Sequence, residues 1–365
     1  MSRVTPDVAF DPVAPDGVPA LSPPDSMVLR RGGCSVLLTR RGLLVAACLG
    51  GVTAVAVALA VIADAGHLSP AQSLAALMGQ GGRAPVLLVR EYRLPRVVAG
   101  LLAGAALGAA GCLTQALAGN RLATPDTLGV NEGATVAVLL SVLGSSAGMI
   151  GAWWIGPLGA AAAAVLVVLA AGDVGTRGYR VLVVGIGVAT LLSSVTELLL
   201  SRQQLGHATA VYAWSVGSLA GRGYAVAVPV GLVLAALLPM ALLIGRRLAV
   251  LRFDADTATA LGVSPRSAGA AALAVAVCLA GLGVGVGGPI GFVALAAPIL
   301  AVRLVGAVRV PVVAASLCGA ALVCAADTLG RVVGPAELPV GVVTSILGGP
   351  FLLWALLTDR STEGR

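Results

Sequence analysis

The stretch 90-REYRLPRVVAGLLAGAALGAAGCL-113 sets three arginines and one glutamate directly before a long apolar run. The run consists mostly of alanine, glycine, valine and leucine, and it extends to about residue 118. About 20 apolar residues in a helix cross the ~30 Å hydrocarbon core of a bilayer. The stretch therefore predicts a membrane-spanning helix that enters the bilayer immediately after a charged cluster.

The rest of the chain has the same apolar character. Of its 365 residues, 58% are hydrophobic and only 11% are charged, against about 25% charged residues in an average soluble domain. The apolar runs are continuous rather than alternating, which favours helices over the strands of a membrane barrel. We therefore predict an all-α, polytopic membrane protein.

Composition divides the chain into three parts. Residues 1–40 are rich in Pro, Asp, Val and Ser and are predicted to be a disordered cytoplasmic tail. Residues 41–358 are predicted to be the transmembrane domain, and 359–365 a cytoplasmic C-terminal tail. The predicted spans are 42–63, 97–118, 132–150, 153–171, 181–200, 225–245, 268–286, 291–306, 312–330 and 340–357.

The distribution of arginine supports this topology. All 23 basic residues are arginines, and the ten spans put sixteen of them on the cytoplasmic side and seven outside, as the positive-inside rule expects. Arg90, Arg93 and Arg96 are exceptions that fall outside. Taken alone, they are either anchors that reach for lipid headgroups or a docking site for a charged partner.

Glycine patterns predict close helix packing. Gly100, Gly104 and Gly108 stand four residues apart, which gives one helix face a smooth groove for another backbone. The run 283-GVGVGG-288 matches G-x-G-x-x-G formally, but it follows a span and has no acid about 20 residues later, as a dinucleotide site needs. We interpret it as a broken or tightly packed helix end before Pro289.

Several kinds of site are not supported by the sequence. The chain has no lysine, so it lacks the residue that a Walker A loop uses to reach nucleotide phosphates. We find no catalytic triad, no paired carboxylates and no metal-ligand spacing, and only two histidines are present. The sequence therefore predicts no catalytic residue, no metal site and no cofactor bound by this chain.

Two carboxylates lie inside predicted spans, away from the first residues of those spans. Asp327 and Glu197 are costly at mid-bilayer. Each is either a proton relay or a structural, hydrogen-bonded acid near a helix end, and the second interpretation is favoured because no second intramembrane charge lies nearby in sequence.

Two loops carry polar residues. The loop 120-NRLATPDTLGVNEGA-134 cannot face lipid, so it is either a turn with Asp126 or Asn131 capping the next helix, or part of a polar path. In the segment 246–267, acids at Asp254 and Asp256 precede a short run that predicts an amphipathic helix outside the bilayer. That helix is either a docking surface or a solvated loop.

Taken in order, these segments closely resemble the FecCD-type permeases of ABC importers for ferric siderophores, haem and cobalamin. The resemblance covers about residues 60–358. It is carried by RLPRVVAGLLAGAALGAAGCLTQAL (93–117), N-x-LATPDTLGV (120–130), YAWSVGSLAG (212–221), TATALGV (257–263), GGPIGFVALAAP (287–298) and ADTLGRVVGPAELPVGVVTSILGGPFLLWALL (326–357).

The resemblance implies a ten-span type II importer subunit in the plasma (inner) membrane, with both termini cytoplasmic. It implies a homo- or heterodimer of permease subunits, two separate ABC ATPase subunits that bind ATP and Mg²⁺, and an extracytoplasmic substrate-binding protein. Carried over residue by residue, it implies three sets of sites. They are docking of the binding protein at Arg93, Arg96 and Arg331, a cytoplasmic gate at Asn120 and Leu122, and ATPase coupling at Asp254, Asp256, Thr257, Ala258, Leu261 and Gly262.

The chain departs from the family pattern in both loops. Arg121 replaces the usual proline of the gate loop, and the acids of the coupling loop are moved to Asp254 and Asp256. The leading hypothesis is an ATP-driven importer of a metal chelate, most directly a ferric siderophore, with haem or cobalamin as alternative cargoes. The rival is a proton-coupled secondary transporter that uses Asp327 or Glu197.

Overall fold

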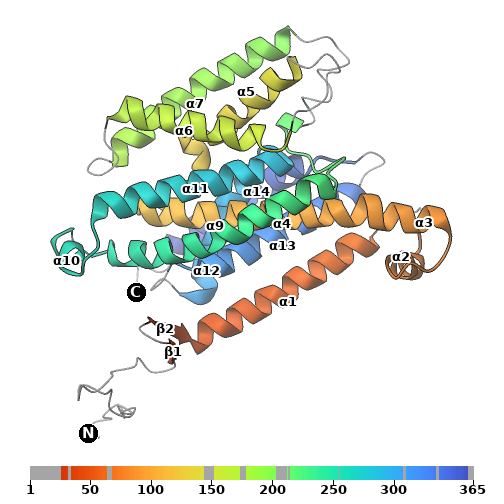
Figure 1. The fold of residues 1–365 in the computed structure, drawn as a ribbon, viewed down its shortest axis with the longest axis horizontal. Helices are drawn as coiled ribbons and strands as arrows, with labels where there is room; N and C mark the ends of the chain where they lie inside the picture. Colours follow the sequence, from red (N-terminus) through yellow and green to blue (C-terminus); the bar gives the residue numbers. More distant parts are fainter. Residues whose placement is uncertain are drawn as a thin grey trace, which may run out of the picture.

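The computed structural model describes residues 26–31, 34–63, 68–143, 152–172, 178–202, 212, 214–253, 255–306, 310–333 and 337–360. It is helical apart from one short hairpin (Figure 1). The longer helices are α1 (Arg40–Ile62), α4 (Leu94–Ala118), α5 (Val130–Leu143), α6 (Ile155–Ala171), α7 (Gly178–Ser201), α9 (Tyr224–Val250), α11 (Pro265–Gly287), α12 (Gly291–Val305), α13 (Val312–Val332) and α14 (Val340–Arg360).

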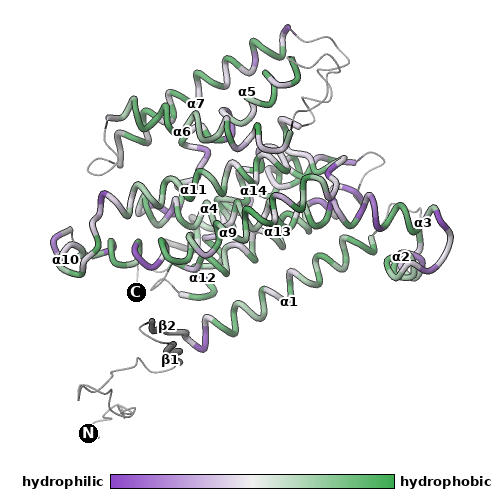
Figure 2. The backbone as a smooth tube through the Cα atoms, viewed as in Figure 1, coloured by the Kyte–Doolittle hydropathy of each residue, from purple (hydrophilic) through white to green (hydrophobic). Residues whose placement is uncertain are grey.

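These ten helices coincide with the ten predicted spans. Six of the described helices are long and apolar enough to cross a membrane by length and composition, and four more are shorter apolar helices. The hydrophilic residues gather mainly near the helix ends (Figure 2). The prediction of an all-α, polytopic membrane protein is therefore confirmed, although α5 ends at Leu143 and residues 144–150 of its predicted span lie outside the described residues.

The helices form a central group with α1 on one flank and α5, α6 and α7 on the other (Figure 1). Helix α4 lies at the centre, where it packs against α9, α11, α12 and α13. The predicted glycine groove is the reason for this position. A Cβ added at Gly104 or Gly108 would overlap a backbone carbonyl of α13, so only glycine permits the two backbones to approach this closely.

Specific contacts identify the two ends of the bundle. At one end Arg41, in the first turn of α1, bonds the carbonyl of Leu304 at the end of α12, and Arg303 bonds the carbonyl of Ala355 in α14. The last turn of α1 lies at the opposite end, beside Arg93 and Arg331. The start of α1 and the last turns of α14 therefore share one end, which we call the inner end, and the other is the outer end.

Part of the N-terminal tail differs from the expectation of disorder. Strands β1 (Ser26–Arg31) and β2 (Cys34–Thr39) pair antiparallel directly before α1. Both strands contain short apolar runs, Met-Val-Leu in β1 and Val-Leu-Leu in β2. Gly32 and Gly33 stand between them in the sequence, a pattern that favours a two-residue hairpin.

The connection from α4 to α5 enters the interior. After the left-handed Gly119, the chain runs to the short 3₁₀ helix η2 (Pro125–Leu128), whose Pro125 and Leu128 are buried. Gly133, near the start of α5, already packs against Gly159 and Ala163 in the middle of α6. Helix α5 therefore begins inside the bundle, and the second half of the loop, from η2 onward, is covered by protein rather than by lipid.

Candidate functional site

The outer end holds a cluster of five charged side chains, which we call the charged cluster. Its members are Arg93, Arg96, Asp327, Arg331 and Glu337. Helix α4 supplies Arg96, η1 (Leu88–Arg93) supplies Arg93, and α13 supplies Asp327 and Arg331. Glu337 precedes α14. All three arginines predicted to dock a partner lie in this one cluster.

Arg96 occupies the middle of the charged cluster and uses both edges of its guanidinium group. Its Nε and Nη2 donate to Asp327 Oδ1 at 3.1 and 2.9 Å. Its Nη1 donates to Glu337 Oε2 at 2.8 Å. The inner partner is buried, since the side chain of Asp327 is 4% exposed, whereas the side chain of Glu337 is 60% exposed.

Asp327 is paired on both of its oxygens. Arg96 occupies Oδ1, and Arg331 Nε lies 3.1 Å from Oδ2, one helical turn further along α13. The structural interpretation of this acid relied on the absence of a second intramembrane charge at pairing distance in sequence. Arg331, four residues later, and Arg96, 231 residues away, nevertheless both pair with it. Asp327 is thus hydrogen-bonded near the end of α13, the arrangement that the structural interpretation expects.

Arg93 and Arg331 also hold the end of α1. Arg93 Nη1 donates to the carbonyl of Val61 at 3.0 Å, and Arg331 Nη2 donates to the carbonyl of Ala60 at 2.8 Å. The last carbonyls of a helix lack intrahelical donors, and cations near them also interact well with the helix dipole. Both arginines are buried, so they fasten α1 to the outer end of α4 and α13.

Arg90 also has a structural role, which the sequence did not suggest. Its Nε and Nη2 donate to the carbonyl of Leu77 at the end of α2 (Pro70–Leu77). Arg90 lies in η1, a π-helical turn that links α3 (Arg83–Leu87) to α4. Pro95 lacks the N–H that would bond the carbonyl four residues earlier. The N–H of Leu94 donates to the carbonyl of Val89, five residues earlier, which is the spacing of a π-helical turn.

The predicted gate residues lie in the exposed first part of the loop after α4. Asn120 Oδ1 accepts a hydrogen bond from the backbone N–H of Leu122 at 2.9 Å, and Leu122 is exposed. This contact forms a local turn. Further along, Asp126 is hydrogen-bonded to Asn131 and lies beside Gly291 at the start of α12. The loop thus begins as an exposed turn at Asn120 and then becomes buried, where Asp126 lies against the start of α12.

The predicted coupling segment forms a short helix at α10 (Ala255–Ala260), as expected from the sequence. Gly262 has φ of 81°, and Val263 N–H donates to the carbonyl of Ala258 at 2.9 Å, which closes the helix with a left-handed glycine. Ala258 is buried, whereas Phe253 and Leu261 are exposed. Asp256 and Thr257 belong to the helix, and Asp254 lies outside the described residues.

Helix α7 carries an exposed polar stripe. Its members Thr190, Ser194, Glu197 and Ser201 recur every three or four residues, so they share one face. A polar face on an apolar span normally lies against protein or water rather than lipid. Glu197, the second acid considered as a proton relay, is therefore exposed on this stripe and is not enclosed within the subunit.

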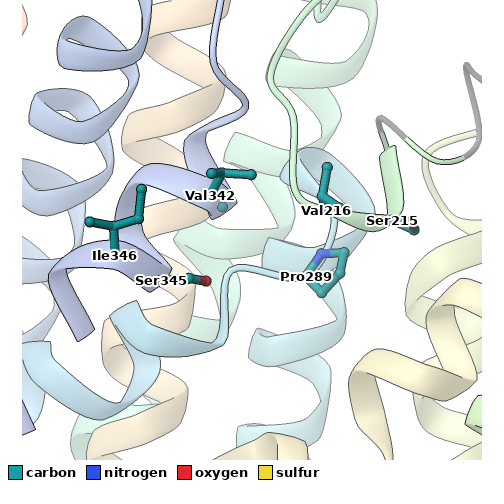
Figure 3. Close-up of a pocket in the computed structure, with 7 residues that line it drawn as sticks. Ser215, Val216, Pro289, Val342, Ser345 and Ile346 are labelled. Atoms are coloured by element: carbon teal, nitrogen blue, oxygen red, sulfur yellow. The ribbon is translucent and has the colours of Figure 1, made fainter. Parts of the chain in front are cut away.

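An open hollow of 510 Å³ lies where three segments meet. Ser215 and Val216 come from the segment before α9, Pro289 from the break between α11 and α12, and Ser345 and Ile346 from α14 (Figure 3). The backbone N–H of Gly341 donates to the carbonyl of Gly217 at 3.0 Å, which ties α14 to this segment. The hollow has mostly apolar walls with two hydroxyl groups.

The G-x-G-x-x-G run serves packing, as the sequence indicated. A Cβ at Gly283 would contact Leu107 at 2.7 Å, and one at Gly285 would contact Pro157 at 2.6 Å. Gly288 ends α11 with φ of 71°. Within the described residues, no three His, Cys, Asp or Glu side chains lie close enough to form a metal site.

Known proteins are similar to this chain in sequence and in fold. The sequence profile of the FecCD transport family matches residues 44–358. Ferric enterobactin transport system permease protein FepG of Escherichia coli (strain K12) is 36% identical over 80% of this chain and 89% of its own length. Achromobactin transport system permease protein CbrC of Dickeya dadantii (strain 3937) is 35% identical over 80% of this chain and 85% of its own length.

A solved structure of a metal-chelate type ABC transporter in an inward-facing conformation has the same fold, with a TM-score of 0.76. It is 22% identical and covers 87% of this chain and 99% of its own. In this family the membrane subunit transports and a separate subunit hydrolyses ATP. The chain therefore belongs to the FecCD transport family, the permease subunits of ABC importers for iron chelates.

Proposed function

We propose that this chain is the permease of an importer that takes up a ferric siderophore delivered by an extracytoplasmic binding protein. The family match and the names of the relatives support this cargo, since these proteins are named for ferric enterobactin, achromobactin and iron(3+)-hydroxamate. Two of these three names state a ferric cargo. Haem and cobalamin are the alternative cargoes within the resemblance.

The observation that carries the proposal furthest is the outward edge of Arg96. A binding protein that presents a carboxylate could pair with this edge without disturbing Asp327, which holds the inner edge. Arg93 and Arg331 would contribute positive potential, while their guanidinium groups hold the end of α1. Charges at a docking surface mainly set the rate and orientation of encounter.

The cargo would pass between two permease subunits. The exposed polar stripe of α7 supports this path, because a second subunit would enclose Thr190, Ser194 and Glu197 away from lipid. The exposed turn at Asn120 and Leu122 would form the gate at the inner end of the path. The relatives FepG and FepD are 36% and 35% identical to this chain, so a pair of like subunits or of homologous subunits fits equally.

The ATPase subunits would dock at the inner end. Helix α10 supports this assignment, since exposed Phe253 and Leu261 flank a short helix whose Ala258 is packed inward. Asp254, Asp256, Thr257 and Gly262 would complete the contact segment. ATP and Mg²⁺ would bind to those ATPase subunits, and their closure would move α10 and the helices joined to it.

The arginine asymmetry supports a multi-pass location in the plasma membrane with both termini cytoplasmic. The start of α1 and the last turns of α14 lie at one end of the bundle, as this topology requires. The division into an N-terminal tail of residues 1–40, a transmembrane domain of 41–358 and a short tail of 359–365 remains part of the proposal, but the hairpin of β1 and β2 replaces disorder in the last part of the N-terminal tail.

The rival hypothesis is proton-coupled transport through Asp327 or Glu197. Asp327 is a poor relay in this geometry, because Arg96 and Arg331 occupy both of its oxygens. Glu197 is exposed on α7 and lies on the proposed subunit interface. Both observations favour ATP-driven transport.

Docking is tested by reconstituting the permease in lipid vesicles with its ATPase and binding protein. Arg96→Lys keeps a charge for Asp327 but cannot present a second edge. We expect it to lower ATP hydrolysis stimulated by the loaded binding protein several-fold at low salt. Arg83→Lys, at an exposed arginine of α3 outside the charged cluster, is the matched control. Equal stimulation of wild type and Arg96→Lys would contradict the docking assignment.

A further inference from the structure

The outward edge of Arg96 is already occupied by a carboxylate of the same chain. Glu337 Oε2 lies 2.8 Å from Arg96 Nη1. This is the geometry of a charge-assisted hydrogen bond between a guanidinium group and an acid. A partner that docks through a carboxylate on Arg96 must therefore either avoid this edge or displace Glu337 from it.

The two carboxylates on Arg96 differ in how firmly they are held. Asp327 is 4% exposed and is paired with Arg331 as well, so its removal would leave buried charge uncompensated. Glu337 is 60% exposed, and within the part of the chain that the structure describes its carboxylate forms a direct ion pair only with Arg96. Exposed ion pairs contribute little to stability and are weakened by salt. Glu337 is thus the exchangeable partner and Asp327 the permanent one.

We propose that Glu337 is a place-holder that fills the carboxylate-binding edge of Arg96 until an acidic side chain of the binding protein displaces it. This inference rests on the proposed docking function and adds an internal competitor to it. The place-holder keeps Arg96 satisfied and correctly oriented in the undocked permease. It also weakens the attraction of Arg96 for acidic partners that cannot displace it.

Displacement of Glu337 would loosen the segment before α14, which leads to the open hollow. Glu337 stands three residues before the start of α14, and Leu338 N–H donates to the carbonyl of Gly330 at 2.9 Å. Four residues after Glu337, Gly341 is bonded to Gly217 beside the open hollow that Ser345 also lines. Release of the side chain would therefore remove one of the attachments that hold the segment before α14.

Removal of any negative charge at this end of the molecule would also strengthen the attraction of an acidic partner. A variant at Glu337 would then bind that partner more tightly without any role for the edge of Arg96. Glu91 supplies the control for this effect, because it is exposed in η1 at the same end of the molecule and carries the same charge. Glu91→Gln removes one negative charge without touching the outward edge of Arg96. A double variant with Arg96→Lys shows whether the effect acts through that edge.

The experiment measures the dissociation constant between the binding protein of the same importer, loaded with its ferric siderophore, and the permease–ATPase complex in lipid nanodiscs at low salt. We expect Glu337→Gln to tighten binding about two- to five-fold, the range that corresponds to the loss of one exposed ion pair. We expect less than half of this effect for Glu91→Gln. In the Arg96→Lys background, Glu337→Gln should have no effect.

The outcomes separate this inference from the docking proposal. If Arg96→Lys weakens binding but Glu337→Gln leaves it unchanged or weaker, docking stands and the place-holder is excluded. If Glu337→Gln and Glu91→Gln tighten binding equally, or the effect persists with Arg96→Lys, only general charge is involved and the place-holder is again excluded. If neither Arg96→Lys nor Glu337→Gln changes binding, the docking assignment and the place-holder both fail.

Discussion

Two apolar helices of this protein have the same mean hydropathy over their most apolar stretches. One lies at the centre of the bundle and the other on its flank (Figure 1). In the continuous helix Arg83–Ala118, which contains α4, 83% of the most apolar stretch is buried, whereas in α7 the figure is 11%. Helix α4 has glycine at positions 100, 104 and 108, and α7 has the polar stripe at positions 190, 194, 197 and 201. Hydropathy predicts that both helices cross the membrane, but it does not predict which one lies at the centre.

The size and polarity of the residues on one face account for this difference. Small residues let the backbones of α4 and α13 come into contact. Because lipid provides no hydrophobic driving force for helix association, this close packing must supply the stability. Lipid offers no hydrogen-bonding groups to the polar side chains of α7, so this face is suited to a protein partner or a water-filled path. Accordingly, α4 determines the fold of the subunit and α7 is available for its function.

The largest effect is expected from filling the groove of α4. Gly108→Leu would force its side chain into the carbonyl of Ala315, so the helices would have to separate. We expect destabilisation above the ~3 kcal/mol that overpacking commonly reaches, with loss of folded protein in fluorescence-detected gel filtration. Gly187→Leu on α7, where a Cβ meets nothing within 4 Å, should behave as wild type. Equal tolerance of both variants would contradict the central role of α4.

The next largest effect is expected on stability, when the acids Asp327 and Glu197 are each replaced by their amides. Asp327→Asn breaks the buried pairing with Arg96 and Arg331, and we expect a loss of about 3 kcal/mol, measured as a lower thermal midpoint in detergent. Glu197→Gln, on the exposed face of α7, should leave that midpoint unchanged. If Asp327→Asn keeps full stability but abolishes transport, Asp327 acts in the proton-coupled manner of the rival hypothesis.

The smallest effect is expected from comparing how fast cysteines on two faces of α7 react with a water-soluble reagent. In the assembled dimer in vesicles, a cysteine at Glu197 should react with a water-soluble maleimide or cross-link to the second subunit. A cysteine at the exposed Leu191 lies about 120° around the helix, and it should react much more slowly because it faces lipid. Thermal midpoints should be equal for both variants. The same labelling rate at both positions would mean that α7 has no polar partner or path.

The sequence predicted helix positions well, because the signal is local. Continuous apolar runs gave ten spans whose ends lie within a few residues of the observed helices, except where the chain is not described. The groove at Gly104 and Gly108 and the packing role of Gly283 and Gly285 were also predicted correctly. Each of these features depends on residues close together in the chain.

The partners of the charged residues were not predictable in this way. Arg96 and Asp327 are 231 residues apart, and Arg331 bonds a carbonyl 271 residues away. The family resemblance grouped the three arginines by function but did not reveal that Arg93 and Arg331 are buried against α1. The π-helical turn before Pro95 could have been suspected from the missing N–H of proline, but its length could not.

The central claim is that this permease moves a ferric chelate with energy from ATP. The most direct test is uptake of radioactive ferric siderophore into vesicles that contain the permease, its ATPase and its binding protein. The account predicts uptake only when ATP is present on the ATPase side, with no effect of a proton ionophore. Uptake that proceeds without the ATPase and collapses with the proton gradient would contradict it.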